Sequence, residues 1–157
     1  MRKSLFLFSF IIAVTALSGQ VVAASNTVAA SKASPAPTAA AVKQNNPYEV
    51  AGIDNAAAFS TFFSKLQKEV KAKNKEAVAG LVSYPLRVNS GGKSIEIKNK
   101  KQFIAKYNQI ITDKVKKKLL AQKEADLFVN WKGVMVGDGE VWIGQFGKKI
   151  AVFAINK

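Results

Sequence analysis

The 157-residue chain contains no cysteine and no histidine. Without them it can form neither a disulfide nor a thiolate or imidazole metal site. The same absence excludes Ser-His-Asp and Cys-His catalysis, and we identify no catalytic residue. No Walker loop is present, and we expect no cofactor. A metal ion would need oxygen ligands alone, and the ten carboxylates are scattered along the chain, so we expect no metal site.

Acidic residues are also few, because ten Asp and Glu stand against 24 Lys and Arg, a net charge of +14. A charge of this size attracts anions. We expect an anionic or acidic partner, either a protein or an envelope component; the alternative is a solvated lysine surface. The densest positive cluster, and the candidate electrostatic contact, is Lys114, Lys116, Lys117 and Lys118. Aromatic residues do not interleave with these lysines, which argues against nucleic acid as the partner.

The apolar run near the N-terminus is too short for a membrane span, which needs about 20 apolar residues. A positively charged start precedes an uncharged stretch from Leu5 to Leu17, and small residues follow up to Ala23 and Ala24. This three-part pattern predicts a secretory signal peptide over residues 1–24, cleaved after Ala23 or Ala24. We expect export by the general secretory route to a soluble, periplasmic or secreted form, because no cysteine is available for lipid attachment.

Beyond this segment, residues 25–46 are rich in alanine, serine, threonine and proline. Such a composition cannot bury enough apolar surface to order itself, so we predict a flexible linker. Residues 47–157 are then expected to form a single domain. That domain must fold by burying apolar side chains, since the chain has no disulfide.

Two periodicities divide the domain into helices and strands. Apolar residues three and four apart predict helices over 55–73, 75–81 and 101–111, and a short one capped by Thr112. Alternating segments predict strands over 84–88, 94–98, 140–143 and 150–155, and a segment over 127–130 leads into 133–137, so that the chain ends in three or four strands. Pro85 places its segment at a sheet edge or among the first residues of a strand. Turns are predicted at residues 89–92 and, as a two-residue hairpin turn, at Asp138-Gly139.

The order of these elements predicts an α+β domain with helices packed on one face of a curved antiparallel sheet. The final strand, 150–155, is apolar on both faces. A strand of this kind is covered on both sides. We expect helices on one side and a pocket, a helix or a second subunit on the other, and a homodimer through the sheet is one arrangement that satisfies this.

The element order, together with three segments, resembles the nuclear transport factor-like superfamily, the cone-like fold shared with ketosteroid isomerase and SnoaL-type cyclases. The segments are Tyr84-Pro85-Leu86-Arg87-Val88, the helix around Phe103 to Tyr107, and the stretch from Leu127 to Trp142, which is similar to small exported bacterial members. The resemblance implies a pocket between the curved sheet and the helices. Members include enzymes, ligand binders and interaction domains, so the fold alone does not assign a function.

Four residues outside the lysine cluster are candidate site residues. Arg87 lies on a predicted strand and could hold a carboxylate or phosphate by two hydrogen bonds; the alternative is an exposed strand arginine. Trp131 and Trp142 flank the predicted hairpin and form either an aromatic platform for a sugar or a partner side chain, or part of the core. Glu140 is either a pocket carboxylate or a cross-strand partner to a lysine.

These features favour an exported, non-enzymatic binding or protein-interaction module, and an immunity-type protein that neutralises a toxin is one specific version. A small apolar or anionic ligand is a second class of partner. One alternative is an enzyme of isomerase or hydrolase type that uses a buried carboxylate, in a pocket closed by Trp142 and Tyr107. The available acids for this role are Asp113, Glu124, Asp126 and Glu140, and the possible hydroxyl donors are Tyr84 and Tyr107. The other alternative is a basic protein held at an anionic envelope surface.

Overall fold

The computed structural model describes residues 45–157, which belong to one compact unit. The predicted signal peptide, 1–24, lies outside the described residues, as does the predicted linker up to residue 44. Asn46 already takes part in the fold, since its side chain accepts a hydrogen bond from the Tyr48 N–H at 3.0 Å and donates one to the Ile53 carbonyl at 2.6 Å. The described contacts therefore begin one residue before the predicted domain boundary.

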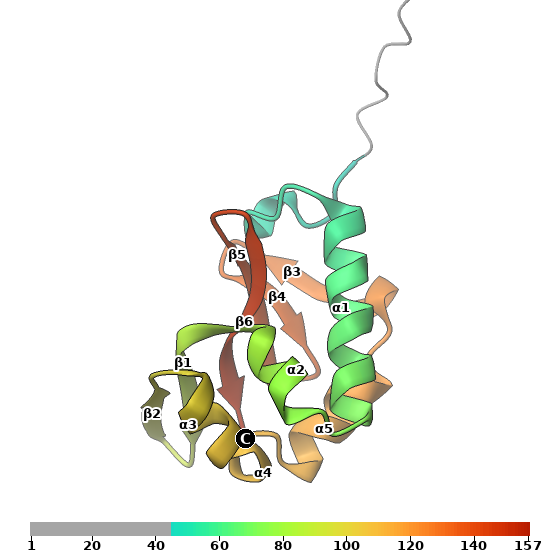
Figure 1. The fold of residues 1–157 in the computed structure, drawn as a ribbon. Coiled ribbons are helices and arrows are strands. Elements are labelled where there is room, and N and C mark those ends of the chain that lie inside the picture. Colours follow the sequence, from blue (N-terminus) through green and yellow to red (C-terminus); the bar gives the residue numbers. More distant parts are fainter. Residues whose placement is uncertain (1–44) are drawn as a thin grey trace, which may run out of the picture. The chain divides into compact units, whose positions relative to one another are not determined.

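Five α-helices and six strands make up this unit (Figure 1). The helices are α1 (Ala56–Lys71), α2 (Lys75–Gly80), α3 (Lys100–Ala105), α4 (Tyr107–Ile110) and α5 (Asp113–Ala121), with short 3-10 turns η1 (Glu49–Ala51) and η2 (Glu124–Asp126). The strands are β1 (Val82–Ser90), β2 (Lys93–Ile97), β3 (Phe128–Asn130), β4 (Gly133–Val136), β5 (Val141–Phe146) and β6 (Lys149–Asn156).

Polar side chains fix the start of four helices. Each N-cap accepts a hydrogen bond from the backbone N–H three residues on, and the caps are Asn55, Asn74, Asn99 and Thr112. This contact satisfies one of the N–H groups that a helix leaves free at its first turn. The predicted helix over 55–73 is confirmed as α1, whose apolar stripe is buried at Phe59, Phe62, Phe63, Leu66 and Val70.

The segment predicted as one helix over 101–111 is two helices, α3 and α4, so that prediction was wrong. Lys106 separates them, with a ψ of 12° that departs from helical geometry. The spacing of apolar residues continues through the break, because Phe103 and Tyr107 are both buried. Their rings pack edge to face, with 5.9 Å between the ring centres. Spacing alone therefore gave no signal for the interruption.

The sheet has the strand order β2-β1-β6-β5-β4-β3, and it is mixed rather than antiparallel. Its other pairs are antiparallel, but β1 and β6 run parallel. Of the two positions predicted for Pro85, the sheet edge was wrong, because β1 lies between β2 and β6. Pro85 falls where the β1–β6 register shifts, between Val82 and Arg87, and an irregular stretch of ladder tolerates a residue without an N–H.

Two hairpin turns show how loop chemistry sets strand register. The predicted turn before residue 94 is confirmed: Gly91 and Gly92 both have positive φ, 54° and 75°, and connect Ser90 to its partner Lys93. The predicted two-residue turn at Asp138-Gly139 was wrong. Val136 pairs with Val141, so the turn is a four-residue loop, residues 137–140.

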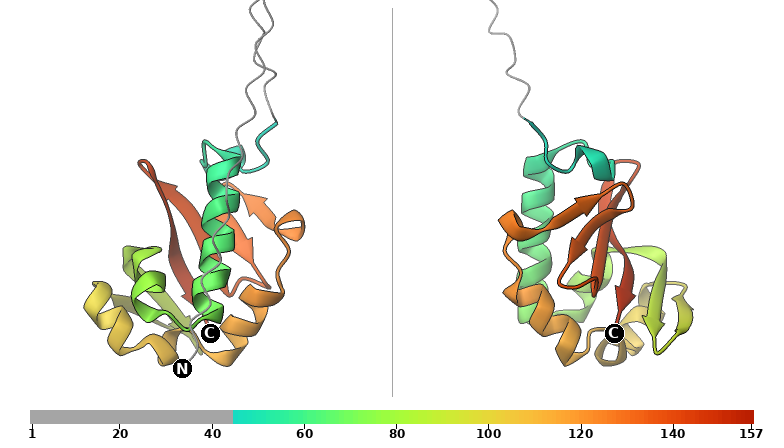
Figure 2. Two further views of the ribbon diagram at one scale, coloured as in Figure 1. Left: turned by 45° about the vertical axis from the view of Figure 1, so that its right-hand side comes forward. Right: turned by 180° about the vertical axis from the view of Figure 1, so that it is seen from behind.

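Helices α1 and α2 lie on one side of the sheet, as predicted for an α+β domain (Figures 1 and 2). The space between is filled by a buried apolar core, in which the largest side chains are Phe59, Phe63, Phe103, Ile53, Leu66 and Leu86. Seen from behind, in the right view of Figure 2, the strands face the viewer and α1 lies behind them. Among residues 45–157 no helix is both long and apolar enough to span a membrane.

Candidate binding face of the sheet

A row of six side chains crosses the whole sheet, one from each strand. The register makes them direct neighbours in the order Glu96, Arg87, Ala154, Trp142, Met135 and Phe128. Their chain neighbours on β1 and β5, such as Leu86 and Ile143, belong to the buried core, so the row lies on the side of the sheet away from α1. We call this surface the open face.

A β-bulge in β6 adds one more side chain to the open face. Trp142 pairs with Ala154 and Ile143 pairs with Val152, so Phe153 is an extra residue without a partner on β5. Phe153 and Ala154 consequently line the same depressions on this face. Bulges recur next to binding sites because they redirect a side chain in this way.

Two depressions on the open face meet at Arg87, Phe153 and Ala154. The smaller, of about 180 Å³, is closed by Lys132 and Trp142 and by the amides of Asn89 and Asn156. We call it the Arg87–Lys132 pocket. The larger, of about 440 Å³, extends to Glu96 and Phe146. The smaller pocket is lined by two cations and no acid, whereas the larger holds both signs of charge.

Large apolar side chains stand exposed around this face. Phe128 is 55% exposed and Phe146 is 48% exposed. Trp131 is 77% exposed at the tip of the β3–β4 hairpin, where the Lys132 ammonium lies 5.1 Å from the centre of its ring. Trp131 is therefore not a core residue. Trp142 is half-buried, and it lines the Arg87–Lys132 pocket.

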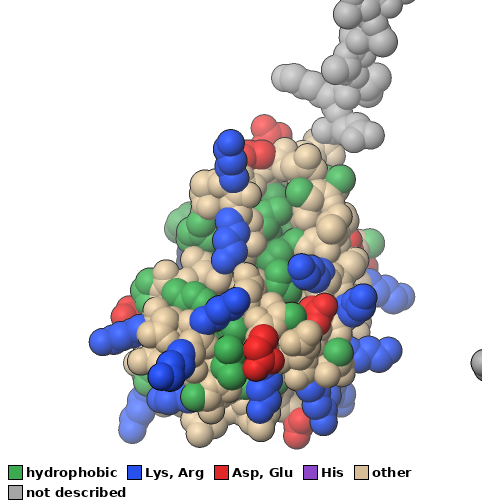
Figure 3. All heavy atoms as spheres, viewed as in Figure 1, with side chains coloured by type: hydrophobic (Ala, Val, Ile, Leu, Met, Phe, Trp, Pro, Cys, Tyr) green, Lys and Arg blue, Asp and Glu red, His purple; other side chains and the backbone are tan. Residues whose placement is uncertain are grey.

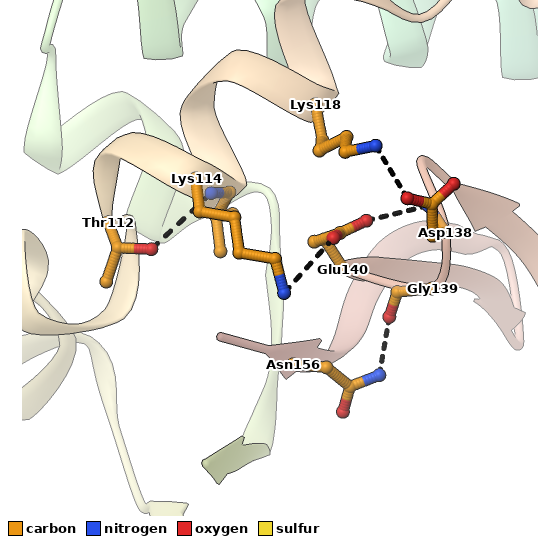
Figure 4. Close-up of polar contacts among 8 residues, drawn as sticks. Thr112, Lys114, Lys118, Asp138, Gly139, Glu140 and Asn156 are labelled. Carbon is orange, nitrogen blue, oxygen red and sulfur yellow. Dashed lines mark hydrogen bonds and ion pairs between the residues drawn. The ribbon is translucent and has the colours of Figure 1, made fainter. Parts of the chain in front are cut away.

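The four lysines of the α5 cluster do not share one environment. Lys114 and Lys118, one turn apart, both reach the 137–140 loop (Figure 4). The Lys118 ammonium contacts the Asp138 carboxylate at 2.6 Å, and that of Lys114 lies 3.4 Å from Glu140. Lys116 lines a separate depression with Lys73 and Asp113, and Lys117 is exposed.

The buried Glu140 side chain, which is only 4% exposed, holds the 137–140 loop together. One carboxylate oxygen faces Lys114, and the other accepts a hydrogen bond from the Asp138 N–H at 2.7 Å. Its lysine partner, Lys114, comes from α5 and is not a cross-strand neighbour. The loop is further held by Asn156, whose amide donates to the Gly139 carbonyl at 2.5 Å (Figure 4).

The contact between Lys118 and Asp138 shifts both of their pKa values. The hydrogen bond and charge of Lys118 lower the pKa of Asp138, and Asp138 in turn raises the pKa of Lys118. Both groups are solvent-exposed, so the contact stabilises the fold only slightly. Its main effect is to reduce the free positive charge that α5 presents.

The other acids that the sequence offered as bases do not gather in a pocket. Glu124 accepts hydrogen bonds from the Tyr48 hydroxyl at 2.9 Å and the Ser60 hydroxyl at 2.5 Å, which ties η2 to η1 and α1. Burial is the largest cause that raises the pKa of Tyr48, and the hydrogen bond and charge of Glu124 add to it. Within residues 45–157, no three acidic side chains come together as a candidate metal site.

Of the two tyrosines proposed as hydroxyl donors, Tyr107 is a core residue, whereas Tyr84 is half-buried and lines the larger depression of the open face. The Tyr84 hydroxyl donates to the Ala79 carbonyl at 3.0 Å, and burial raises the pKa of Tyr84 to about 12. Burial also raises the pKa of Tyr107, which is 4% exposed and belongs to the core. Tyr107 and Trp142 line different depressions, so the structure does not bring them together around one pocket.

The remaining positive charge is spread rather than concentrated. On the helix side of the molecule, lysine side chains are scattered over the surface with apolar and polar groups between them (Figure 3). The depression between α1, α4 and α5 also holds two lysines, Lys73 and Lys116, but it contains the acid Asp113, whereas the Arg87–Lys132 pocket contains no acid. We therefore take the open face as the candidate functional surface.

Several residues of this face were missed at the sequence level, among them Lys132, Phe153 and the exposed Phe128 and Phe146. Lys132 is one lysine among many, and only the β3–β4 pairing carries it to Arg87. Phe153 looked like one position of a doubly apolar strand. The one signal that could have indicated a bulge is that successive residues of this strand are apolar, so that the sequence does not alternate between a core face and a solvent face.

No match to this chain was found among protein-family models, curated proteins or solved structures. The geometry and chemistry of the open face are therefore the basis on which a function can be proposed.

Proposed function

We propose that the chain is an exported, non-catalytic binding protein that captures an anionic partner protein on the open face of its sheet. One observation carries this proposal. The row across the sheet is apolar from β3 to β6 and becomes charged at Arg87, and no helix among residues 45–157 covers it.

Exposed aromatic side chains support a binding role. Phe128, Trp131 and Phe146 each leave about half or more of their surface in contact with water. Folded proteins seldom leave several large apolar groups together on one surface unless that surface meets a partner. Aromatic residues and arginine are also the residue types that protein interfaces favour.

Charge supports an anionic partner rather than a second copy of the chain. Neither Arg87 nor Lys132 forms an ion pair with any of residues 45–157. The full chain has a net charge of +14, and loss of Arg2 and Lys3 with the predicted signal peptide leaves +12, so two copies meeting through this face would both be strongly positive. Like charges oppose such a contact, while an acidic protein is attracted from a distance. A homodimer is nevertheless a defined outcome of the test below.

The carboxylates argue against the enzymatic alternative. Glu140 is the buried acid, but one of its oxygens accepts the Asp138 N–H and the other faces Lys114. A general base needs a carboxylate within reach of a substrate proton. Among residues 45–157, Glu96 is the acid that lines a depression of the open face, and it is exposed.

The element order α1-α2-β1-β2-α3-α4-α5, followed by the four strands β3 to β6, supports membership of the nuclear transport factor-like superfamily as part of this proposal.

A matched pair of variants tests the open face. Phe146 and Ile95 are both 48% exposed, but Phe146 lies against Phe153 on the open face, whereas Ile95 is the direct partner of the buried Val88 on the opposite face. The native protein and the variants Phe146→Glu and Ile95→Glu are immobilised and exposed to an envelope extract of the source cells. Circular dichroism verifies that all three are folded.

The proposal expects an acidic protein that the native chain and Ile95→Glu retain and Phe146→Glu loses. Equal retention by all three, or no retained protein, would overturn it. Light scattering adds a third outcome. If the native chain is a dimer and Phe146→Glu a monomer, a second copy occupies the open face, and the proposal of an anionic partner fails.

A further inference from the structure

We infer that the Arg87–Lys132 pocket is a carboxylate-binding subsite with an aromatic wall, which takes an acidic group of the partner together with an apolar side chain beside it. This inference rests on the proposed function and specifies the chemistry that the partner must present. Its basis is the way three strands and the β3–β4 turn bring two cations and two aromatic rings around one small depression.

The floor of the pocket is low because Ala154 lies between two larger neighbours. In the register, Arg87 of β1 and Trp142 of β5 are the direct partners of Ala154 of β6. The methyl group of Ala154 leaves the space between them open. The resulting depression of about 180 Å³ is large enough for a carboxylate and part of an apolar side chain, but not for a whole drug-sized ligand.

The aromatic wall is fixed by the fold. The Phe153 ring occupies space that two glycines leave free, because a Cβ on Gly133 would lie 3.2 Å from the ring and one on Gly144 would lie 3.4 Å from it. Phe146 also contacts the ring, edge to face, with 5.9 Å between the ring centres. A ring held in this way does not need to be ordered when a ligand binds, which lowers the entropic cost of binding.

The cations of the pocket are available to a ligand. Arg87 is the direct cross-strand partner of Glu96, yet their charged groups form no ion pair. No acid lines the Arg87–Lys132 pocket itself, although Glu96 lines the adjoining depression. A planar guanidinium binds a carboxylate through two parallel hydrogen bonds, and the lysine adds a point charge from the second side.

The mixture of charge and aromatic surface selects the chemistry of the ligand. An anion that enters the pocket would lose part of its hydration shell to contact with Trp142 and Phe153. This desolvation costs a phosphate dianion more free energy than it costs a carboxylate. A carboxylate with a neighbouring apolar side chain replaces the lost water with two hydrogen bonds and covers the rings, so an acidic residue or chain terminus beside an aromatic residue suits the pocket.

N-acetyl-L-phenylalanine is a suitable probe, since it carries one carboxylate beside one aromatic ring, and its neutral primary amide is the matched control. Binding of each compound to the full protein is followed by NMR, at the Trp142 indole N–H and the Phe153 and Ala154 amides. The acid is expected to shift all three signals and to bind at least about tenfold more tightly than the amide.

Three variants assign that preference to the pocket. Arg87→Gln is expected to reduce the affinity for the acid about tenfold and to leave the amide unchanged, whereas Arg87→Lys, which keeps the charge, falls between. Lys117→Gln removes an exposed lysine elsewhere and should bind as the native chain does. Equal binding of acid and amide, or a preference for the acid that survives in Arg87→Gln, would overturn the inference.

The same variants separate this inference from the proposed function. If Phe146→Glu loses the partner and Arg87→Gln retains it with native affinity, the open face binds without the carboxylate subsite, and only the inference falls. If the probe binds through Arg87 but Phe146→Glu still retains the native set of proteins, the subsite stands and the proposed capture of a partner protein falls.

Discussion

The Lys114 ammonium lies 3.4 Å from the carboxylate of Glu140, so an exposed residue of α5 neutralises the buried acid that shapes the loop between β4 and β5. The two partners differ sharply in exposure, with 62% for Lys114 and 4% for Glu140. Removing the Glu140 side chain should therefore destabilise the fold more than removing the Lys114 side chain, because solvent compensates for lost contacts only at the exposed partner.

We predict that Glu140→Ala lowers the free energy of unfolding by about 2 kcal/mol, since it removes the charged acceptor of the Asp138 N–H. Lys114→Ala should cost less than about 1 kcal/mol, because its ammonium is mostly in water. Urea denaturation of the two variants and the native chain measures both values. Equal losses would show that the loop does not depend on the buried carboxylate.

The three tyrosines should ionise only at strongly alkaline pH. The folded chain raises the pKa of Tyr48, Tyr84 and Tyr107, that of Tyr84 to about 12, against about 10 for free tyrosine. The unfolded chain therefore releases these protons first. Stability should be fully present below about pH 10 and should fall as pH rises from there through the folded-state pKa values.

Tyrosinate absorbance, measured alongside circular dichroism during an alkaline titration, checks this prediction. Ionisation and loss of structure should occur together. A third of the tyrosinate signal appearing near pH 10 in the folded protein would mean that one phenol is exposed, and substitution of each tyrosine by phenylalanine would identify it.

Gly133 should be far less replaceable than Gly52, although both have positive φ. At Gly52, with a φ of 70°, a Cβ would meet no atom within 4 Å, and alanine should cost about 1 kcal/mol for the backbone conformation alone. At Gly133 a Cβ would lie 2.6 Å from the Ile143 carbonyl oxygen as well as against Phe153. Thermal denaturation of Gly133→Ala should show a loss at least about 2 kcal/mol greater than that of Gly52→Ala. Similar losses would mean that β4 can shift away from β5.

Expression in an exporting bacterial host tests the N-terminal prediction. The protein recovered from the periplasm should begin at Ala24 or Ser25, as determined by mass spectrometry of the intact chain. Recovery of the full 157-residue mass from the membrane fraction would show that the segment is a retained anchor instead.

Local features of the fold were predictable from local sequence. The stripe from Phe59 to Val70 defines α1, and Asn55 and Thr112 accept the hydrogen bonds expected of N-caps. The glycines at 91 and 92 permit the positive φ angles that their hairpin requires. In each case the residues that determine the structure lie within a few positions of one another, so the pattern can be recognised in the sequence.

The features that were missed depend on contacts between distant segments. The parallel pairing of β1 with β6 joins residues more than 60 positions apart, such as Arg87 and Ala154, and no local pattern encodes it. The bulge at Phe153 follows from the registers of two neighbouring strands together. Arg87 was recognised as a candidate from its strand position and charge, but its pairing with Lys132 across one pocket needed the folded sheet.

The central place of β6 has a consequence for how a newly made chain folds. This strand follows all the others in the sequence, yet it is the one that joins the β2–β1 hairpin to the β5-β4-β3 meander. Until β6 pairs, the β2–β1 hairpin and the β5-β4-β3 meander each lack the strand that joins them, so the sheet is incomplete. Pairing over such sequence distances is slow. Closure of both halves on β6 is therefore expected to be a late step in folding.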